Sequence, residues 1–312
     1  MATTTQTTAN QALEVKEYYN RTLLSRLTPT LVFDKFAQKK PVPKNNGKTV
    51  EFRRFKSLAA ATTPLTEGVT PDGNSFQVEK VNATLKQYGD YIQTSDVLND
   101  VAIDPITTEV VELLGEQAGL TIDTIARDII SAGTTVQYAG AKTGTSSITA
   151  ADKLSYAEIL KAVRTLKQNH AKPFEDGYYI GFINAAQAYD LQQDEMWQDV
   201  SKYNGAKAIM DGEIGKLGKV RFIETENLKV KNGAGASSIN VHCAIVLGKD
   251  AFGTVELEGK GGVETIIKTP KGNDGNTSDP LNQRSTAGWK AMKTYVILQD
   301  LALLRLECAV SA

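Results

Sequence analysis

The segment from Thr49 to Leu98 constrains the fold of this chain most, because it reads as a long β-ribbon with little sequence of its own to pack against. Two runs alternate polar and apolar residues at strand period, TVEFRRFKSL and FQVEKVNATLKQYGDYIQ, and they flank the turn-rich centre LTEGVTPDGNSF. An isolated two-stranded ribbon is only marginally stable in water. Arms of about 16 residues reach about 50 Å, so we expect the ribbon to project and to lie on another protein molecule.

The composition of the chain is that of an ordinary globular protein, with 312 residues of which 41% are hydrophobic. That content suits one large unit with insertions or two compact units. The N-terminus, MATTTQTTANQ, has neither a basic nor an apolar segment, and no apolar run reaches the roughly 18 residues of a membrane span. The sequence therefore predicts a protein that is made and used in a cytoplasm and does not interact with a membrane.

Charge is unevenly distributed along the chain, although its sum is only -1. From Lys35 to Lys56 there are eight basic residues and a single acid, Glu51. Such a segment is either a solvated arm or a site for acidic partners, including nucleic acid. A protein that grips nucleic acid usually carries more positive charge overall, so both interpretations stay open at this point.

The strongest helix signal follows the ribbon and runs from about Thr107 to Ala132. Apolar residues recur there at spacings of three and four, which places them on one face of a helix. This stripe consists of Val110, Leu114, Ala118, Ile122, Ile125 and Ile129. At 1.5 Å per residue the helix is about 40 Å long, which suggests a spine on which sheet elements lie.

Shorter helices and strands make up the rest of the chain. A capping box of Ser155 and Glu158 begins a second helix, SYAEILKAVRTLKQNH. The buried strand YYIGFI precedes the helix AAQAYDLQQDEMWQDV, and strands then dominate as far as GWKAMKTYVILQDLALLRLECAV. A short helix is expected between Leu13 and Phe36, interrupted near Pro29. Helices and strands without regular βαβ alternation indicate the α+β class.

No motif for catalysis, cofactor binding or metal binding is complete. The string GEIGKLGKV is similar to a phosphate-binding loop, but Glu213 stands where the pattern needs its first glycine and Val220 where it needs Ser or Thr. The string NDGNTSDP has oxygen ligands at calcium-loop spacing without the required glycine and final glutamate. The two histidines have no partners at metal-binding spacing. We therefore expect neither an enzyme nor a bound cofactor.

Other reactive side chains are expected to have structural roles. Cys243 and Cys308 lie in apolar, strand-like runs, where buried thiols are common, and a disulfide between them stays open. Asp194 is expected to be a solvated charge on the polar face of a helix. His170 fits a position near a helix C-terminus and His242 a position in a strand.

A local pattern of scaffold residues accompanies this order of elements. It comprises Pro173, Phe174, Asp176, Gly177 and Tyr178, then Tyr189, Asp190, Leu191 and Trp197, and finally Gly212, Gly215, Gly218, Val220, Phe222, Glu224 and Thr225. With these residues, nearly the whole chain resembles the major capsid proteins of tailed bacteriophages with the Hong Kong 97 capsid fold, and among them the small coat proteins of short-tailed phages and prophages. Many members have His-Pro where this chain has Asn184-Ala185.

The resemblance implies an α+β fold divided into an arm, a loop and two domains. Residues 1–48 would form the N-terminal arm and residues 49–98 the extended loop, a β-hairpin. A peripheral domain would combine residues 99–151, including the spine helix at about 107–132, with residues 283–312. An axial domain would span residues 152–282.

The resemblance also implies the function of a major capsid protein. Such a protein self-assembles as hexamers and pentamers into the icosahedral shell of a virion, which encloses double-stranded DNA and contacts it without sequence specificity. A scaffolding protein, a portal protein and a decoration protein are candidate partners besides other copies of the chain. Assembly would take place in the cytoplasm of a host bacterium.

Inter-subunit contacts are expected along the extended loop. Arg53, Arg54 and Lys56 at its base would pair with acids of a neighbouring copy, although the basic arm could instead face the DNA. The other candidate contact residues lie at the tip of the loop and are Glu67, Gly68, Pro71, Asp72 and Gly73.

Three other functions compete with this one. An encapsulin-like shell would use the same fold for a cellular compartment. A DNA-binding protein would use residues 35–56, and its binding would depend strongly on salt concentration. An enzyme whose site is assembled from distant residues would show a pocket with convergent titratable groups.

Overall fold

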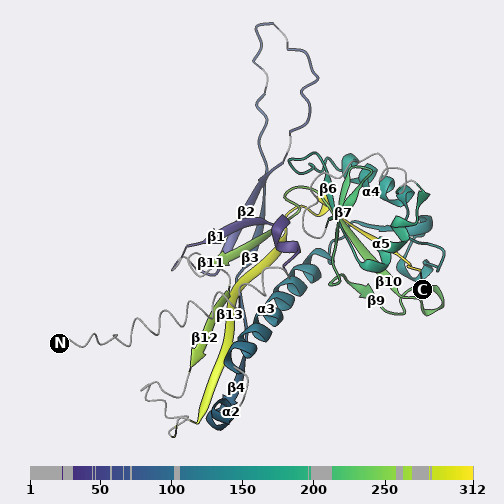
Figure 1. Cartoon of the computed structure of the whole chain (residues 1–312). Helices are drawn as coiled ribbons and strands as arrows, with labels where there is room; N and C mark the ends of the chain where they lie inside the picture. Colours follow the sequence, from purple (N-terminus) through teal and green to yellow (C-terminus); the bar gives the residue numbers. More distant parts are fainter. Residues whose placement is uncertain are drawn as a thin grey trace.

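The computed structural model of the protein describes residues 23, 31–43, 45, 47–56, 58–65, 67–70, 72–101, 106–195, 197, 213–257, 263–268, 281 and 283–311. Several expectations concern residues outside these ranges. They are most of the helix expected between Leu13 and Phe36, the glycine at position 212, the calcium-loop-like string and Pro71 at the loop tip. Figure 1 shows two sheet-based units that a long helix joins, and a ribbon that projects from one of them.

The first unit is a five-stranded sheet with the long helix on one face. Its strands are β1 (Gln38–Val42), β11 (Phe252–Leu257), β13 (Arg284–Ile297) and β12 (Val263–Lys268), with β4 (Lys86–Ser95) also paired to β13. The β4 strand runs antiparallel to β13 from Lys86, opposite Lys293, to Ser95, opposite Arg284. The indole Nε1 of Trp289 donates a hydrogen bond to Gln117 Oε1 at 3.1 Å, which fixes the helix on the sheet.

The second unit is a seven-stranded sheet that carries two helices. Its strands in order are β5 (Val136–Tyr138), β14 (Leu303–Cys308), β10 (Val241–Leu247), β6 (Tyr179–Ile183), β8 (Val220–Glu224) and β7 (Glu213–Leu217), with β9 (Val230–Lys231) also paired to β10. The helices are α4 (Tyr156–Gln168) and α5 (Ala185–Gln192). Together the two units confirm the α+β class.

Short elements connect these parts. They are the 3-10 helices η1 (Phe33–Phe36), η2 (Ala139–Ala141), η3 (Thr145–Ser147), η4 (Ala236–Ser238) and η5 (Asp300–Ala302), and the helix α2 (Asp96–Val101).

The long helix α3 (Ile106–Ile130) confirms the predicted spine to within two residues at each end. The face that carries Leu114, Ala118 and Ile122 is buried, as the apolar spacing of the sequence requires. Beyond the last turn, Gly133 lies so close to Leu303 that a Cβ atom there would come within 2.6 Å of a leucine methyl group. The chain therefore leaves the helix where only glycine fits against the second sheet.

The predicted capping box at the start of α4 is wrong. Ser155 is the N-cap residue but makes no capping hydrogen bond with its side chain. The Glu158 carboxylate accepts instead from Gln137 Nε2 at 2.8 Å and from the Lys161 ammonium at 2.7 Å. Asp194 takes over the capping role, because its Oδ2 accepts from the Tyr156 amide at 2.9 Å. Asp194 is therefore a structural cap and not a solvated charge.

The ribbon itself is shorter than the sequence predicts. Strand β2 (Thr49–Phe55) pairs antiparallel with β3 (Val78–Thr84), and this two-stranded sheet ends where Thr49 lies opposite Thr84. The following strand, β4, belongs to the five-stranded sheet, and Asp96–Val101 is helix α2. Period-two alternation is the same in a ribbon and at a sheet edge, so the sequence could not show where one strand leaves its partner.

The strand pairing also differs from the expected division into domains. Strands β11 and β12, expected within an axial domain at 152–282, pair with β13 of the five-stranded sheet. Strand β14, expected in the peripheral domain at 283–312, lies inside the seven-stranded sheet between β10 and β5. The chain thus crosses between the sheets three times, once more than the contiguous division allows, because the apolar Leu303–Cys308 segment is buried in that second core.

Candidate assembly surface

The base of the ribbon is anchored on the five-stranded sheet. Val50 and Phe52 of β2 pack with Ala83 of β3 against a small core that also contains Val42 and Val255. Phe52 is only 8% exposed. The expectation of a ribbon without packing of its own is therefore wrong at the base, where this core fixes the direction in which the ribbon leaves the body.

An aromatic pair lies where the strand pairing ends. Phe55 is opposite Val78 in the last register position, and the Lys56 amide donates to the Gln77 carbonyl at 3.0 Å just beyond it. The ring centroids of Phe55 and Phe76 are 5.8 Å apart, yet these side chains are 66% and 71% exposed. Aromatic side chains are enriched at protein interfaces because they supply a large apolar area. The aromatic pair is therefore the strongest candidate for a docking anchor on the ribbon, and sequence reasoning missed it.

The three predicted basic contact residues have acidic partners within the same ribbon. Arg53 binds the Glu51 carboxylate, whereas Arg54 Nη2 and Lys56 Nζ lie 2.9 and 3.1 Å from the two oxygens of Glu79. Hydrogen bonds from Arg53 and from Lys56 lower the pKa of Glu51 and of Glu79, respectively. Exposed ion pairs of this kind are weak and exchange easily with other partners. Arg53 and Glu51 are two residues apart on one strand, a spacing that the sequence shows, whereas Arg54 lies opposite Glu79 in the register of β2 and β3.

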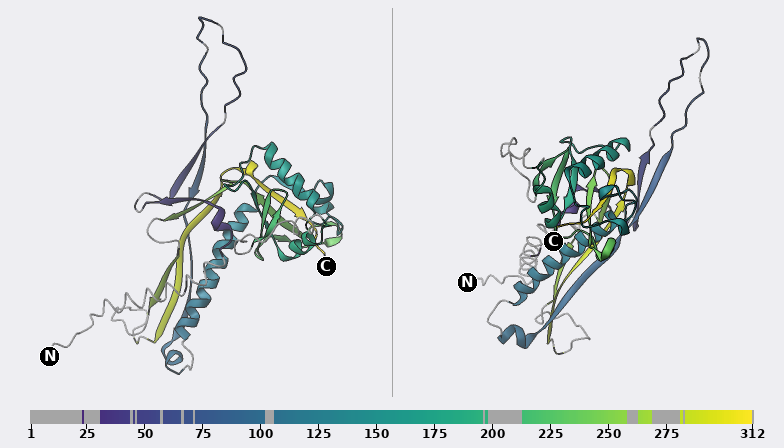
Figure 2. Two further views of the ribbon diagram at one scale, coloured as in Figure 1. Left: turned by 45° about the horizontal axis from the view of Figure 1, so that its top comes forward. Right: turned by 90° about the vertical axis from the view of Figure 1, so that its right-hand side faces the viewer.

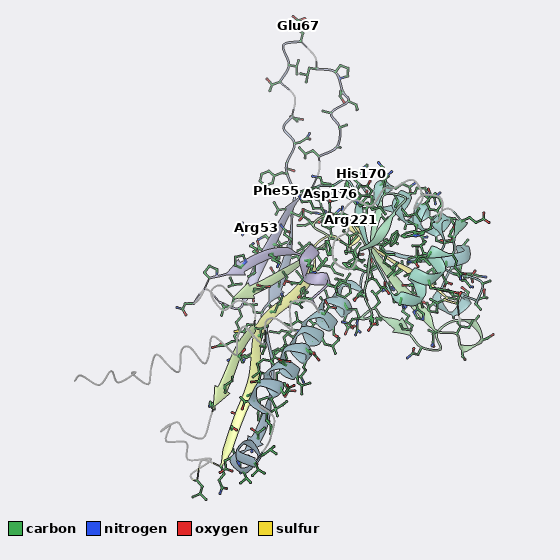
Figure 3. All side chains as sticks on the ribbon, viewed as in Figure 1. Arg53, Phe55, Glu67, His170, Asp176 and Arg221 are labelled. Carbon is green, nitrogen blue, oxygen red and sulfur yellow. The ribbon has the colours of Figure 1, made fainter. Side chains whose placement is uncertain are left out.

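The tip of the loop is acidic and apolar. Between Ser57 and Gln77 the only charged residues are Glu67 and Asp72. The chain turns at Glu67 and Gly68, and Gly68 has a φ of 77°, which favours glycine. Leu65 and Val69 are 77% and 63% exposed beside this turn. Figure 3 shows Glu67 at the far end of the loop and Arg53 and Phe55 near its base, while Asp72 and Gly73 are likewise exposed.

The residues of the basic segment make contacts along the body as well as in the ribbon. Lys39 lies 3.3 Å from Asp34, and the Lys40 ammonium donates to the Glu51 carbonyl at 2.7 Å above the ring of Phe52. With the three ribbon cations, at least five of the eight basic residues have a partner within the chain. Most of the described basic residues in this segment are thus paired within their own subunit.

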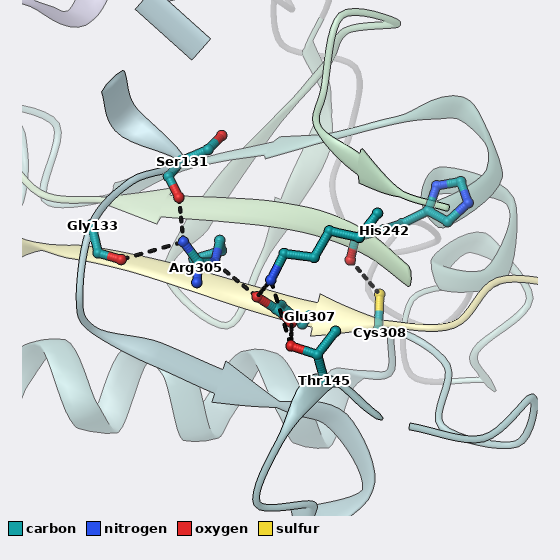
Figure 4. A network of polar contacts seen from close by, with 8 residues as sticks. Ser131, Gly133, Thr145, His242, Arg305, Glu307 and Cys308 are labelled. Atoms are coloured by element: carbon teal, nitrogen blue, oxygen red, sulfur yellow. Dashed lines mark hydrogen bonds and ion pairs between the residues drawn. The ribbon is translucent and has the colours of Figure 1, made fainter. Parts of the chain in front are cut away.

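A buried polar network joins the end of the spine helix to the second sheet (Figure 4). Glu307 is fully buried and accepts from Thr145 Oγ1 at 2.6 Å, from Lys231 Nζ at 2.5 Å and from Arg305 Nε at 2.9 Å. Arg305 Nη1 also donates to the carbonyls of Ser131 and Gly133 beyond α3. Burial alone would raise the pKa of Glu307, but hydrogen bonds from Lys231 and Thr145 hold it below its usual value.

A second junction ties the segment before β1 to the spine helix. Asp123 Oδ1 accepts from the amides of Val32 and Phe33 at 3.0 and 3.2 Å, and Asn227 Nδ2 donates to its Oδ2 at 3.1 Å. Burial raises the pKa of Asp123, although these hydrogen bonds oppose the shift. The ring of Phe33 packs 4.7 Å from that of Phe182 in β6. Helix η1 is thereby held between the two sheet units.

The neighbouring Asp34 reaches the five-stranded sheet. Its carboxylate lies 2.6 Å from Lys293 Nζ and accepts from Tyr295 Oη at 2.9 Å. Burial alone would raise the pKa of Asp34, but Lys293 lowers it below the usual value. Together with the two junctions described above, this contact links η1, the spine helix and both sheets into the body from which the ribbon projects.

The described residues contain no group of three or more His, Cys, Asp and Glu side chains that could hold a metal ion. His170 lies just beyond α4 with a φ of 54°, and His242 lies in β10 beside the Asn184 amide, as the sequence predicts. Cys243 and Cys308 are free, and burial raises their pKa values to about 11 and about 12. Among the described helices, none is long and apolar enough to cross a membrane.

Comparison with known proteins identifies the fold and the family. A family model for phage capsid proteins matches residues 78–306. The capsid of Ralstonia phage GP4 is 13% identical with a TM-score of 0.71, covering 89% of this chain and 88% of that one. For the capsid of cyanophage Pam1 the identity is 13%, the TM-score 0.67 and the coverage 93% of each chain. A virus-like particle from Pyrococcus furiosus is 12% identical with a TM-score of 0.53, covering 94% of this chain and 99% of that one.

No curated protein matches the chain in sequence. The structural similarities confirm the Hong Kong 97-type capsid fold that the order of elements resembles. The family model covers well over half of the chain, including β3, the spine helix and most of both sheets. The chain therefore belongs to the phage capsid protein family.

Proposed function

We propose that this phage capsid protein is the repeating subunit of an icosahedral shell, in which copies form hexamers and pentamers around double-stranded DNA. The observation that carries the proposal is the projecting ribbon. It has a rigid base, an exposed aromatic pair and an acidic, apolar tip, and its own subunit covers none of the described tip residues. Membership of a capsid family makes the chain a structural protein of the virion.

The two sheets define the two proposed domains. The five-stranded sheet with α3 forms the peripheral domain, and the seven-stranded sheet with α4 and α5 forms the axial domain. The extended loop is the segment from Thr49 to Thr84, shorter than the sequence indicates. Residues before β1 act as the N-terminal arm, which η1 ties to both domains.

The ribbon is the part that joins one copy to the next. Each ribbon contributes a modest contact, but every subunit both gives and receives one, so the contacts add up over a closed lattice. A contact between two different surfaces of identical subunits closes into a ring when the rotation between copies is right. Hexameric and pentameric rings of this kind are the units from which a closed shell is built.

The proposed contact residues fall into two groups. The aromatic pair forms the centre of the first, and Arg53, Arg54 and Lys56 surround it, exchanging their internal ion pairs for acids on the neighbour. The second group is the tip, with Glu67, Gly68, Pro71, Asp72 and Gly73. A scaffolding, portal or decoration protein and the packaged DNA are further proposed partners, and assembly is assigned to the host cytoplasm.

A cellular compartment of the encapsulin type is the second candidate, because a virus-like particle from Pyrococcus furiosus shares the fold. Its TM-score of 0.53 lies well below the 0.71 of the Ralstonia phage capsid. Binding of DNA by an isolated subunit is disfavoured, because the net charge of the chain is only -1, whereas proteins that grip nucleic acid usually carry more positive charge.

Electron microscopy of the chain, coexpressed with its neighbouring genes, tests the proposal. We expect closed particles tens of nanometres wide. As a matched variant, residues 58–76 are replaced by a short Asn-Gly turn, which keeps the paired part of the ribbon and removes the tip together with Phe76 of the aromatic pair. This variant should fold but form no shell. A wild-type chain that stays monomeric under all these conditions would overturn the proposal.

A further inference from the structure

A groove lies on the second unit between helix α4 and the turn that joins β7 to β8, and it is here called the α4 groove. Leu160 and Val163 of α4 form its apolar floor, and Arg164, Lys167 and Lys219 form its rim. Leu160 is 43% exposed, although the outer face of a surface helix is normally polar. An apolar centre inside a polar rim is the usual anatomy of a protein interface.

The cations of the rim are not neutralised within the subunit. In the part of the chain that the structure describes, none of the three has an ion-pair partner. Other cations of the same unit do have one, since Lys161 Nζ lies 2.7 Å from the Glu158 carboxylate and Arg221 Nη2 lies 2.8 Å from that of Asp176. Three like charges around one groove attract an anionic partner.

The backbone at Lys219 is in a conformation that lysine rarely adopts. Gly218 and Lys219 are the two central residues of the turn between β7 and β8, with φ values of 56° and 69°. Turns of this type favour Asn and Gly at the central positions. A lysine therefore occupies a strained position where glycine would be unstrained, and such strain is typical of functional sites.

Gly218 brings this turn close to α4. A Cβ atom at Gly218 would come within 3.3 Å of Leu160 Cδ2 and 3.4 Å of Tyr156 Cε2. The lack of a side chain there keeps the floor of the groove open and places the strained Lys219 beside it. The turn and the helix thus form one surface, although they are about 50 residues apart in sequence.

The chemistry of the α4 groove suits an acidic protein segment that has an aliphatic side chain. Its carboxylates would pair with the cations of the rim, and the aliphatic side chain would cover Leu160. Nucleic acid fits less well, because its phosphates would bind the rim but would leave the leucine floor exposed.

The occupant of the groove comes from another molecule. Figures 1 and 2 show α4 on the side of the second unit away from the free length of α3, while the ribbon projects from the first unit. Neither the ribbon nor the acids of α3 can therefore cover the groove of their own subunit. The loop tip of a second copy offers only two acids, Glu67 and Asp72, to the three cations of the rim. A segment of a different protein with more carboxylates matches the rim better.

We infer that the α4 groove docks an acidic segment with an aliphatic side chain from a second protein that accompanies the shell. The inference rests on the proposed shell function and gives one accessory protein a binding site and a chemistry. Carboxylates of the segment pair with Arg164 and Lys219, and its aliphatic side chain packs on Leu160.

Binding of a labelled peptide to the purified chain tests the inference. The probe is a fluorescein-labelled peptide in which leucines alternate with pairs of glutamates, and fluorescence anisotropy measures its affinity. We expect R164E/K219E to weaken binding by about tenfold or more. The matched control K229E/K249E changes the net charge equally at exposed sites outside the groove and should bind as the wild type does.

Two further measurements separate binding from folding. K219G removes the strained lysine, so the melting temperature should not fall, yet the peptide should bind more weakly than to the wild type. A second peptide, with serines in place of the leucines, should bind the wild-type chain about tenfold more weakly because it leaves the floor uncovered.

The outcomes separate the inference from the proposed function. Absence of peptide binding, or equal binding to wild type and R164E/K219E, overturns the inference. A single-stranded oligonucleotide that binds more tightly than the peptide and loses affinity in R164E/K219E also overturns it, since the groove would then be a nucleic-acid site. If the wild-type chain forms particles when expressed alone and R164E/K219E does not, the groove belongs to a contact between copies. Failure of the wild type to form particles counts only against the shell function, because peptide binding is measured on the subunit.

Discussion

The ring of Phe52 in the ribbon lies directly over Gly253 of β11. A Cβ atom at Gly253 would come within 3.1 Å of the ring carbon Cζ, closer than packed atoms normally approach. The direction of the ribbon therefore depends on the absence of a side chain at position 253, where the Phe52 ring packs on the sheet. Since Phe52 is almost fully buried, its packing against Gly253 helps to fix the direction in which the whole loop projects.

Substitution of Gly253 should disturb the ribbon base. We expect G253L to lower the free energy of unfolding by about 1–3 kcal/mol through overpacking and to reduce particle yield, because the ribbon is displaced. Chemical denaturation and particle counting by electron microscopy measure the two effects. G144A is the control, since no atom lies within 4 Å of a Cβ there and the backbone at Gly144 is extended. A G253L chain as stable as wild type would show that the base tolerates repacking.

Removal of the aromatic pair should separate assembly from folding. The variant F55A/F76A deletes two rings that are mostly exposed in the subunit, so the free energy of unfolding should change by less than about 0.5 kcal/mol. Particle formation should be lost, because the anchor of the contact is gone. L301A alters another leucine that is 51% exposed and should assemble normally. Normal shells from F55A/F76A would remove the aromatic pair from the interface.

A charge-reversal series distinguishes two roles of the ribbon cations. The variant R53E/R54E/K56E should abolish assembly while the subunit stays folded. The added substitutions E51K/E79K restore opposite charges within the ribbon but not toward a neighbour. We expect no rescue, measured as particle yield at low salt. Recovery of shells in the five-fold variant would mean that the cations serve only the ribbon's own pairing.

Loss of the buried carboxylate at position 307 should destabilise the joint between spine helix and second sheet. Replacing it in E307Q leaves Arg305 and Lys231 without their anion, which should cost about 3 kcal/mol at neutral pH. Chemical denaturation measures this loss. E175Q, which changes an exposed pair with Lys249, should be nearly neutral.

The pH dependence of the same variant gives an independent test. The pKa of Glu307 is lower in the folded chain than in the unfolded one. The carboxylate therefore stabilises the fold above the unfolded value of about 4.3, and that stabilisation is lost as the pH falls through the lower folded value. Unfolding curves of wild type and E307Q should converge in acid. A difference that stays constant with pH would contradict the role of this charge.

The sequence was sufficient to predict those elements whose pattern lies within one continuous segment. The spine helix follows from apolar residues at a spacing of three and four, and one side of that helix meets the sheet as the spacing requires. The strands β6 and β10 follow from continuous apolar runs, and both are buried. The acidic tip of the loop could also be read directly, since charge and turn residues are adjacent in sequence.

Long-range partners could not be predicted in this way. The pairing of β4 with β13 joins segments about 190 residues apart, and the same alternation would suit continuation of the ribbon. Asp194 caps a helix that begins 38 residues earlier, which no local pattern records. The exposure of Phe55 and Phe76 depends on where the pairing of β2 with β3 ends. Such features follow from tertiary packing, so only the three-dimensional structure shows them.

Only Leu85 separates the ribbon strand β3 from β4, and the two strands follow one another from the loop into the five-stranded sheet (Figure 2). A pull on the loop along this direction would load the ladder between β4 and β13 in shear. All its hydrogen bonds would then resist together, whereas a peeling force would break them one after another. A shell linked through its ribbons would thus pass tension from each subunit into its five-stranded sheet, so that outward pressure from the contents is spread over the lattice.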